Sequence, residues 1–494
     1  MSVDPVGKKS ETKIPLDEVV LSLYAAQEKI YPRSTSGIFT TWRWVMIWLT
    51  QLFFYGVPWL EWGQRQSLLF DLEAKRFYIF NLVFYPQDLI YLTAILIISA
   101  LSLFLFTAIA GRLWCGFTCP HTVYTEIFVW FETKIEGDRA ARMKLDAAPM
   151  SAKKLSRKVA KHSVWLIFSL WTGFTFVGYF TPIRELASLT INMSLGPWET
   201  FWVFFYSFAT YGNAGFFREQ MCKYVCPYSR FQSAMFDDDT LIVSYDAPRG
   251  EPRGARSRKA KVNAKELGAC VDCSLCVQVC PTGIDIRKGL QYECIQCGAC
   301  ADVCDTVMDK MGYEPGLVKF STQHGIANNW SRKQILQHIV RPRVLLYAAI
   351  LASLVLGLLV SLWLRTPFRV DVVRDRGVMS RISDDGMLEN VYRLQIMNGT
   401  EVTQHYQLSA SGLEGLRLET EQDDSDEDGI KHNEHSEHSS NSITVKPTEA
   451  RWLIVDLKIE DGSAEPGSHP IIFKIQTLES NEVVTEKSVF LVPR

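Results

Sequence analysis

The sequences CVDCSLCVQVCP, residues 270–281, and CIQCGACADVCD, residues 294–305, decide the fold of the middle of this 494-residue chain. Each holds four cysteines in the spacing C-x2-C-x2-C-x3-C. A [4Fe-4S] cubane needs four thiolates, and three cysteines spaced by two residues wrap one corner of it while the fourth comes from elsewhere. The repeat therefore predicts a ferredoxin-like domain with two [4Fe-4S] clusters, which is typical of an electron carrier.

The ligand assignment follows from the pairing, because the fourth cysteine of each motif binds the cluster of the other motif. The first cluster is expected on Cys270, Cys273, Cys276 and Cys304. The second is expected on Cys280, Cys294, Cys297 and Cys300. The alternatives are structural zinc, which favours paired C-x2-C units with a longer spacer, and disulfides, which need an oxidising compartment. Asp305 stands where the first motif has Pro281, a difference that affects a turn and no ligand.

Hydropathy predicts an integral membrane protein. Five runs without a charged residue approach the length that spans a bilayer as a helix: residues 44–60, 89–110, 163–180, 200–217 and 344–364. The second and fifth are too long and too uniformly apolar for core helices of a soluble protein. The first 36 residues contain no apolar stretch that ends in a cleavage site, so we expect no removed signal peptide.

The basic residues predict the orientation, because Lys and Arg accumulate in short cytoplasmic loops. The loop between the third and fourth runs carries only Arg184. The loop before the third run carries Lys134, Arg139, Arg142, Lys144, Lys153, Lys154, Arg157, Lys158 and Lys161. The N-terminus and residues 218–343 are therefore expected inside and the segment after Arg365 outside. All twelve cysteines then fall on or near the reducing side, which suits metal thiolates.

The four remaining cysteines form a second repeat, C-x3-C-P, at Cys115 and Cys119 and at Cys222 and Cys226. Each motif follows an outside-to-inside run. A spacing of four puts both sulfurs on one helical face, and the following proline tends to end the helix there. Two such helix ends would gather four thiols at the membrane surface, where thiolates favour copper(I). An iron-sulfur centre and four buried small apolar residues are the alternatives. His121, and more weakly Met221, are further candidate ligands.

After Arg365 the pattern changes to short alternating stretches, such as residues 391–397, 452–459 and 470–475, with turns at Asn398-Gly399 and Asp461-Gly462. It predicts an all-β, immunoglobulin-like sandwich. Residues 421–442 form an insert rich in Asp, Glu, Ser and His, which we interpret as a solvated loop. A calcium loop at Asp424, Asp426 and Asp428 is the alternative, as is a metal site at His432, His435 and His438.

Several functions lack support in the sequence. The sequence contains no G-x-G-x-x-G motif and no P-loop, so no motif supports binding of a nicotinamide, a flavin or a nucleotide. The net charge of −2 is uninformative, and the basic linker at residues 246–265 favours anionic lipid over nucleic acid. Electrons must therefore come from another molecule, which we expect to be a cytosolic donor.

Five spans, two C-x3-C-P motifs, a two-cluster insert and an exported sandwich together resemble the FixG/CcoG/RdxA family of cytochrome oxidase accessory proteins. The segment Lys29-Ile-Tyr-Pro-Arg33 is similar to that family's N-terminal signature. The resemblance implies a bacterial inner-membrane protein for cbb3-type cytochrome c oxidase assembly. It also implies a cupric reductase that supplies copper(I) through Cys115, Cys119, Cys222 and Cys226, with oxidase assembly factors or a copper transporter as partners.

The expected organisation is a multidomain membrane protein with an α-helical bundle of five transmembrane helices. Its parts are a cytoplasmic segment 1–37, a membrane domain 38–217, a cytoplasmic ferredoxin segment 218–343, a fifth span 344–364 and a periplasmic immunoglobulin-like domain 365–494. One alternative is a subunit, similar to the NapH and NosR type membrane ferredoxins, that links a quinol pool to a periplasmic reductase. Another is a non-catalytic assembly scaffold.

Overall fold

The computed structural model describes residues 29–63, 65–256, 267–375, 380–383, 385–421 and 442–493. The chain divides into two compact units, each built from three segments. Unit 1 comprises Met1–Trp44, Ala110–Val164 and Phe217–Ile335. Unit 2 comprises Val45–Ile109, Trp165–Phe216 and Leu336–Arg494.

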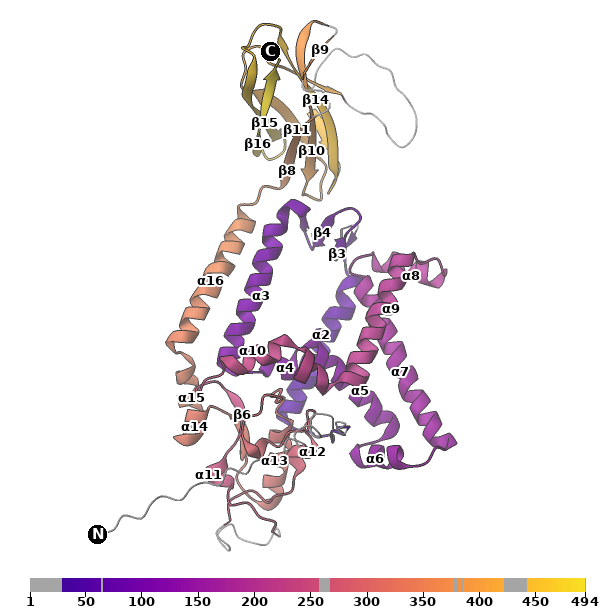
Figure 1. Cartoon of the computed structure of the whole chain (residues 1–494), viewed down its shortest axis with the longest axis vertical. Coiled ribbons are helices and arrows are strands. Elements are labelled where there is room, and N and C mark those ends of the chain that lie inside the picture. The colour runs from indigo at the N-terminus through magenta and orange to yellow at the C-terminus, as the bar shows by residue number, and fades with distance from the viewer. Residues whose placement is uncertain are drawn as a thin grey trace, which may run out of the picture. The chain divides into compact units, whose positions relative to one another are not determined.

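Two short strands that are far apart in the sequence pair with each other and frame the cysteine-rich part of unit 1. Strand β6 (Ile242–Tyr245) pairs antiparallel with β7 (Val318–Ser321), so the cysteine segment is closed between them (Figure 1). Helices α11 (Ala247–Gly250), α12 (Leu275–Gln278) and α13 (Ala299–Met311) lie along this segment. Val243, Ile286, Ala301, Met308 and Val318 form its buried core together with cysteine side chains. The core thus positions the cysteines directly.

Helices occur at all five predicted spans. They are α2 (Ile38–Gly56), α3 (Leu89–Ala110), α7 (Ala152–Val177), α9 (Pro197–Gly212) and α16 (Pro342–Trp363). Within the described ranges, two helices are long and apolar enough to cross a membrane: α16, and α3 with the turn before it, Pro86–Ala110. Helix α9 is too short, with 16 residues, and α2 and α7 are less apolar. The five-span bundle therefore stays a prediction.

Two of the predicted runs end earlier as α-helices than expected. Helix α2 stops at Gly56, and Val57–Trp59 forms a 3-10 turn because Pro58 has no N–H to continue the helix. Helix α9 stops at Gly212, and Asn213–Phe217 continue as a π-helix. Each change of helix type shifts the side-chain positions beyond it.

The loop between the first two predicted spans forms a small sheet, which the sequence analysis did not predict. Strands β3 (Leu68–Asp71), β4 (Arg76–Ile79) and β5 (Leu82–Phe84) make an antiparallel meander in unit 2. The Tyr85 hydroxyl donates to the backbone oxygen of Asn398 at 2.9 Å. Asp88, buried at the start of the apolar run, pairs with Arg365 at 2.7 Å and with Arg369 at 2.6 Å. The loop is therefore tied to the start of the C-terminal domain.

The C-terminal domain is a two-sheet sandwich, as predicted. Its strands are β8 (Phe368–Arg374), β9 (Arg381–Ile382), β10 (Met387–Asn398), β11 (Gln404–Ser411), β12 (Arg417–Glu421), β13 (Ser442–Val445), β14 (Ala450–Glu460), β15 (Gly467–Thr477) and β16 (Val483–Val492). One sheet has the order β12-β14-β10-β8 with β9 beside β10, and the other β13-β11-β15-β16. Alternate residues of β10 and β15, such as Tyr392 and Phe473, are buried between the sheets. The interior of the insert 421–442, predicted to be a solvated loop with calcium and histidine sites as alternatives, lies outside the described residues.

Replacing Phe473 by alanine should destabilise this sandwich. Phe473 is fully buried, and its ring lies 5.1 Å from that of Tyr392. Loss of a buried aromatic side chain costs about 3–5 kcal/mol of unfolding free energy. Pulse proteolysis of the full chain across a urea series would measure it, with a C-terminal tag reporting the sandwich. Ile472→Ala, the neighbour that faces outward on β15, is the matched control. Equal loss in both variants would contradict this packing.

Candidate iron-sulfur and thiol site

The two cysteine motifs share one backbone conformation. In the first, Asp272 and Ser274 have φ of 51° and 55°, and in the second, Gln296 and Gly298 have φ of 55° and 75°. These left-handed residues occupy the second and fourth positions after the first cysteine of each motif. A left-handed residue at every second position turns successive backbone N–H groups toward one concave side, which forms a nest that favours an anionic group. Helices α12 and α13 then begin at the following residues, Leu275 and Ala299.

The structure gathers the eight motif cysteines around two cavities. One is lined by Cys270, Cys273, Cys276 and Cys304, with apolar neighbours such as Val307 and Leu317. The other is lined by Cys280, Cys294, Cys297 and Cys300, and Cys276 contributes to its wall as well. Each cavity thus contains three cysteines of one motif and the fourth cysteine of the other. The donor set fits a [4Fe-4S] cluster in each cavity, and the crossed ligand assignment stays our proposal.

Burial sets the protonation of these thiols when no metal is bound. Removal from water is the largest of the causes that raise the pKa of Cys294 and of Cys304 to about 12, and neighbouring cysteines act in the same direction. Burial raises the pKa of Cys276 to about 11. Metal binding must displace these protons, because the thiolate is the ligand.

The C-x3-C-P motifs differ from the sequence prediction. Cys115 lies in α4 (Leu113–Phe117), but Cys119 lies outside it and caps α5 (Pro120–Glu136). Likewise Cys222 lies in the π-helix Met221–Val225, and Cys226 caps α10 (Pro227–Met235). The prediction that both cysteines share one helical face is therefore wrong. Each proline begins the next helix, where its missing N–H costs nothing, and forces the preceding cysteine to be extended.

The four thiols nevertheless lie near one another in unit 1. Cys115 is buried, and its thiol donates to Oε1 of Gln232 at 3.4 Å. Burial is the largest of the causes that raise the pKa of Cys115 to about 12, and the charges of Cys119, Cys222 and Cys226 act in the same direction. Among the described residues, no group of three or more His, Cys, Asp or Glu side chains has the arrangement of a single-ion site.

This thiol set packs directly against the cysteines of the second cavity. Cys115 and Cys222 belong to one apolar cluster with Ile295, Cys297 and Cys300. Gly116 makes the approach possible, because a Cβ there would lie 2.7 Å from the Ile295 oxygen and 2.9 Å from the Cys297 Cα. The two cysteine sets therefore form one continuous site.

Arg112 is a buried residue of this junction that the sequence analysis missed. Its backbone N–H donates to Oε1 of Gln296 at 2.9 Å. Its guanidinium donates to the backbone oxygens of Tyr292 and Ser229. One side chain thus connects the second cysteine motif to α10. Only its place before Trp114-Cys115 could have drawn attention to it.

Gly116→Ala should weaken this junction. The added methyl group has no space beside Cys297, so the backbone must shift, which costs about 1–3 kcal/mol of stability. We expect a lower midpoint for the thermal loss of cluster absorbance. Gly357→Ala in α16 is the control, because nothing lies within 4 Å of its added Cβ. If both variants lost cluster absorbance at the same temperature, the close contact at Gly116 would not contribute to the stability of the junction.

The other predicted ligand candidates have different surroundings. His121 directs Nε2 to the backbone oxygen of Arg218 at 2.7 Å, and burial lowers its pKa. Met221 begins the π-helix that contains Cys222. Lys29 and Tyr31 of the N-terminal signature both bind Asp146, at 2.8 and 2.7 Å. The signature segment is therefore attached to α6 (Arg139–Ala147).

Comparisons with known families cover most of the chain. The 4Fe-4S dicluster domain family matches residues 217–323, and a 4Fe-4S binding domain family matches residues 92–136. The two matches together include all twelve cysteines. A third family, described as an IG-like fold at the C-terminal of FixG, matches residues 358–493.

Three curated proteins are similar over at least four fifths of the chain. Nitrogen fixation protein FixG of Rhizobium meliloti is 35% identical, covering 83% of this chain and 84% of its own. Proteins RdxB and RdxA of Cereibacter sphaeroides are each 36% identical, covering 82% and 80% of this chain and 86% and 85% of their own. The crystal structure of a FixG-related protein from Vibrio parahaemolyticus is 22% identical with a TM-score of 0.21, covering 26% of this chain and 97% of that one.

Proposed function

The chain belongs to the FixG/RdxA family of iron-sulfur proteins, and from this premise we propose that it reduces copper(II) to copper(I) at a bacterial inner membrane. The copper(I) would serve the assembly of a cbb3-type cytochrome c oxidase. Oxidase assembly factors or a copper transporter would then receive it.

One observation supports the proposal most strongly: two of the four C-x3-C-P thiols belong to the apolar cluster that contains cysteines of the second motif. Cys115 and Cys222 contact the segment that holds Cys297 and Cys300. When bound, [4Fe-4S] clusters supply one-electron transfer, which matches the one electron that copper(II) requires. Cys115, Cys119, Cys222 and Cys226 would hold the substrate ion, because thiolates stabilise copper(I) over copper(II).

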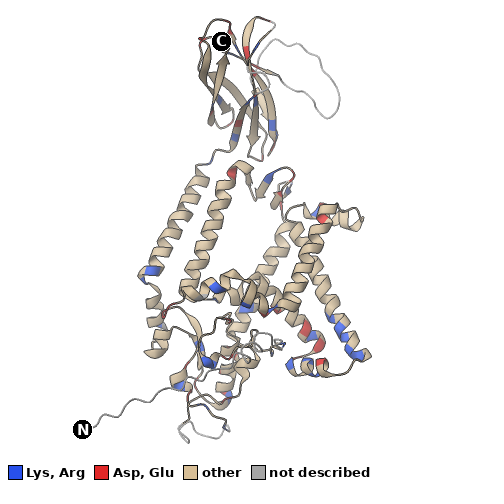
Figure 2. Cartoon of the chain, in the orientation of Figure 1, with Lys and Arg blue, Asp and Glu red and all other residues tan. Residues whose placement is uncertain are grey.

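The membrane arrangement is part of the proposal. Helices α3 and α16 carry almost no charge, whereas Lys and Arg concentrate on the first half of α7 (Figure 2). Helix α9 exposes Phe204 and Phe208, by 60% and 76%. Helices α7 and α9 also approach closely, since a Cβ on Gly173 would lie 2.3 Å from the Ser207 Oγ. Exposed aromatics and small residues at helix contacts are typical of membrane helices.

We propose five spans, with residues 218–343 cytoplasmic and residues 365–494 periplasmic. The positive-inside rule supports this orientation through the basic residues of α6 and α7. The domain boundaries at 217/218, 343/344 and 364/365 belong to the same proposal.

The test is anaerobic mixing of the purified, dithionite-reduced and desalted protein with copper(II). Cluster oxidation is followed optically and copper(I) with a chelator. With two clusters of one electron each, we expect about two copper(I) ions per chain, formed as the clusters are oxidised. Clusters that stayed reduced beside copper(II) would contradict the proposal.

A further inference from the structure

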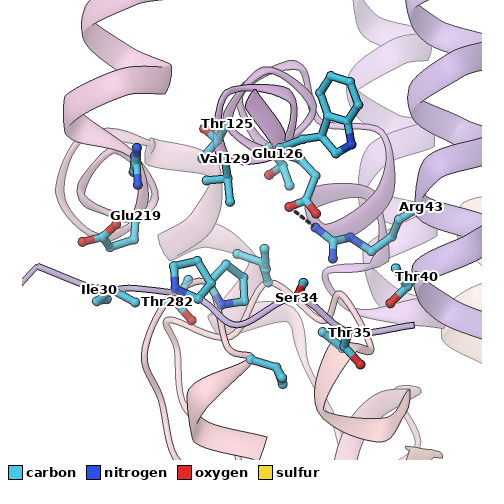
Figure 3. Close-up of a pocket in the computed structure, with 18 of the residues that line it drawn as sticks. Ile30, Ser34, Thr35, Thr40, Arg43, Thr125, Glu126, Val129, Glu219 and Thr282 are labelled. Carbon is cyan, nitrogen blue, oxygen red and sulfur yellow. Dashed lines mark hydrogen bonds and ion pairs between the residues drawn. The ribbon is translucent and has the colours of Figure 1, made fainter. Parts of the chain in front are cut away.

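A cavity of about 160 Å³ lies in unit 1. It is beside the four-thiol set, which consists of Cys115, Cys119, Cys222 and Cys226. Its wall is formed by the N-terminal segment, the start of α2, the inner face of α5 and the loops near the second cysteine motif (Figure 3). An engineered cavity of roughly 150 Å³ holds one benzene molecule. The space therefore suits one six-membered ring with small substituents.

The cavity is polar at two sides and apolar between them. On one side, buried Arg43 donates through Nη2 to Oε2 of Glu126 at 2.7 Å, and Glu219 lies on the other (Figure 3). Trp44 and Trp130, edge-to-face with ring centroids 6.2 Å apart, contribute aromatic surface. A ring with oxygen atoms at opposite positions matches this distribution.

Residues of both cysteine sets border the cavity. Cys222 of the four-thiol set lines it directly. Ile295 and Ala299, which flank Cys297 in the second motif, line it as well, as does Val279 beside Cys280. A ligand in this space would therefore lie next to the groups that accept electrons in the proposed function.

A buried chain of ion pairs leads away from the same cavity. Arg218, which lines the cavity, binds Glu132 at 2.7 Å. From Glu132 the pairs continue through Lys161 at 3.8 Å, Glu136 at 3.1 Å, Lys158 at 2.9 Å and Asp146 at 2.6 Å. Asp146 and its partner Lys29 are partly exposed. Copper(II) reduction needs no proton, whereas the carboxylates that line the cavity, Glu126 and Glu219, can accept protons from a ligand that loses them together with electrons.

The aromatic side of the cavity fits a ligand that arrives from the lipid. Trp130 is 43% exposed, and Lys134 Nζ lies 5.7 Å from its ring centroid. Trp44 begins the apolar run of α2, whose next turns expose Trp48 and Leu52. Tryptophans in such positions are typical of the membrane–water interface.

We propose that this cavity binds the ring of a lipid-soluble hydroquinone, and that this hydroquinone is the electron donor. The inference rests on the proposed function and replaces the expected cytosolic donor. One hydroquinone loses two electrons and two protons and becomes a quinone. The two electrons leave one at a time and reduce two copper(II) ions to copper(I); the second cysteine motif, which borders the cavity, would carry them to the four thiols. The protons pass to the carboxylates that line the cavity, Glu126 and Glu219.

Equilibrium dialysis of the full chain in detergent against duroquinone, a single-ring quinone, tests the cavity, with empty micelles as the blank. Val129→Phe fills the cavity from α5 and should weaken binding at least tenfold. Val159→Phe, the same change at an exposed position of α7, should leave it unchanged. If Val129→Phe lost its cluster absorbance, Thr125→Leu would fill the same space more gently. Equal binding by the wild type and the filled variants, or no binding above the blank, would overturn the proposal.

A second measurement separates this proposal from the copper chemistry. Duroquinol and copper(II) should give two copper(I) ions per duroquinol at a protein-dependent rate that falls at least tenfold in Val129→Phe. Copper(II) reduction by the dithionite-reduced protein, without any duroquinol-dependent rate, would overturn the quinone site alone. Specific duroquinone binding, without copper reduction from either donor, would overturn the proposed function and leave the cavity assignment standing.

Discussion

Simultaneous replacement of Cys115, Cys119, Cys222 and Cys226 by serine is expected to abolish copper(II) reduction and to leave the cluster absorbance intact. Hydroxyl groups do not hold copper(I), whereas thiolates do. The eight motif cysteines line separate cavities and keep their full set in this variant. The measurement is copper(I) formed per chain after dithionite reduction, together with the visible spectrum.

The two double variants are the controls for this result. Cys115 and Cys119 come from the segment around α4, and Cys222 and Cys226 from the segment before α10. If the four thiols act as one site, each double variant should lose copper reduction nearly as completely as the quadruple one. Full reduction by the quadruple variant would place the copper site elsewhere, with His432, His435 and His438 of the insert as the next candidates.

The second large effect concerns the crossed cluster ligands. Cys304 lies in the cavity with Cys270, Cys273 and Cys276, although the other three cysteines of its own motif line the other cavity. Cys304→Ala should therefore remove the first cluster and lower the iron content from about eight to about four atoms per chain. The measurement is iron and acid-labile sulfide per chain in the purified protein.

Pairs of substitutions decide between crossed and uncrossed binding. In the crossed arrangement, Cys304→Ala with Cys270→Ala removes one cluster and retains about four iron atoms, whereas Cys304→Ala with Cys294→Ala removes both. Uncrossed binding gives the opposite pattern. The same iron content in both pairs would mean that the two clusters form cooperatively, and neither arrangement would then be tested by iron alone.

The sequence was most informative where function depends on local spacing. The C-x2-C-x2-C-x3-C motifs predicted the iron-sulfur domain, because the geometry of the cluster constrains adjacent residues. The alternation at residues 391–397 and 470–475 predicted strands that lie within β10 and β15, because inward residues must alternate with outward ones. Both patterns are set by a few neighbouring residues.

The errors and omissions lie where distant segments meet. The C-x3-C-P motifs were assigned to one helical face, but Pro120 and Pro227 begin new helices. Strands β3, β4 and β5 have only four, four and three residues, too few to show a period. Gly116 and Cys297 are far apart in the sequence, so no local sequence pattern could predict their contact.

The ion pairs of Asp88 have a consequence for the order in which the chain is made. Asp88 is synthesised long before Arg365 and Arg369, its two partners across α16. A buried carboxylate without its partner costs roughly 3–5 kcal/mol. Until ribosomal synthesis delivers the last helix, the chain therefore contains an uncompensated acid at the start of its most apolar run. A chain truncated before Arg365 would keep this acid unpaired.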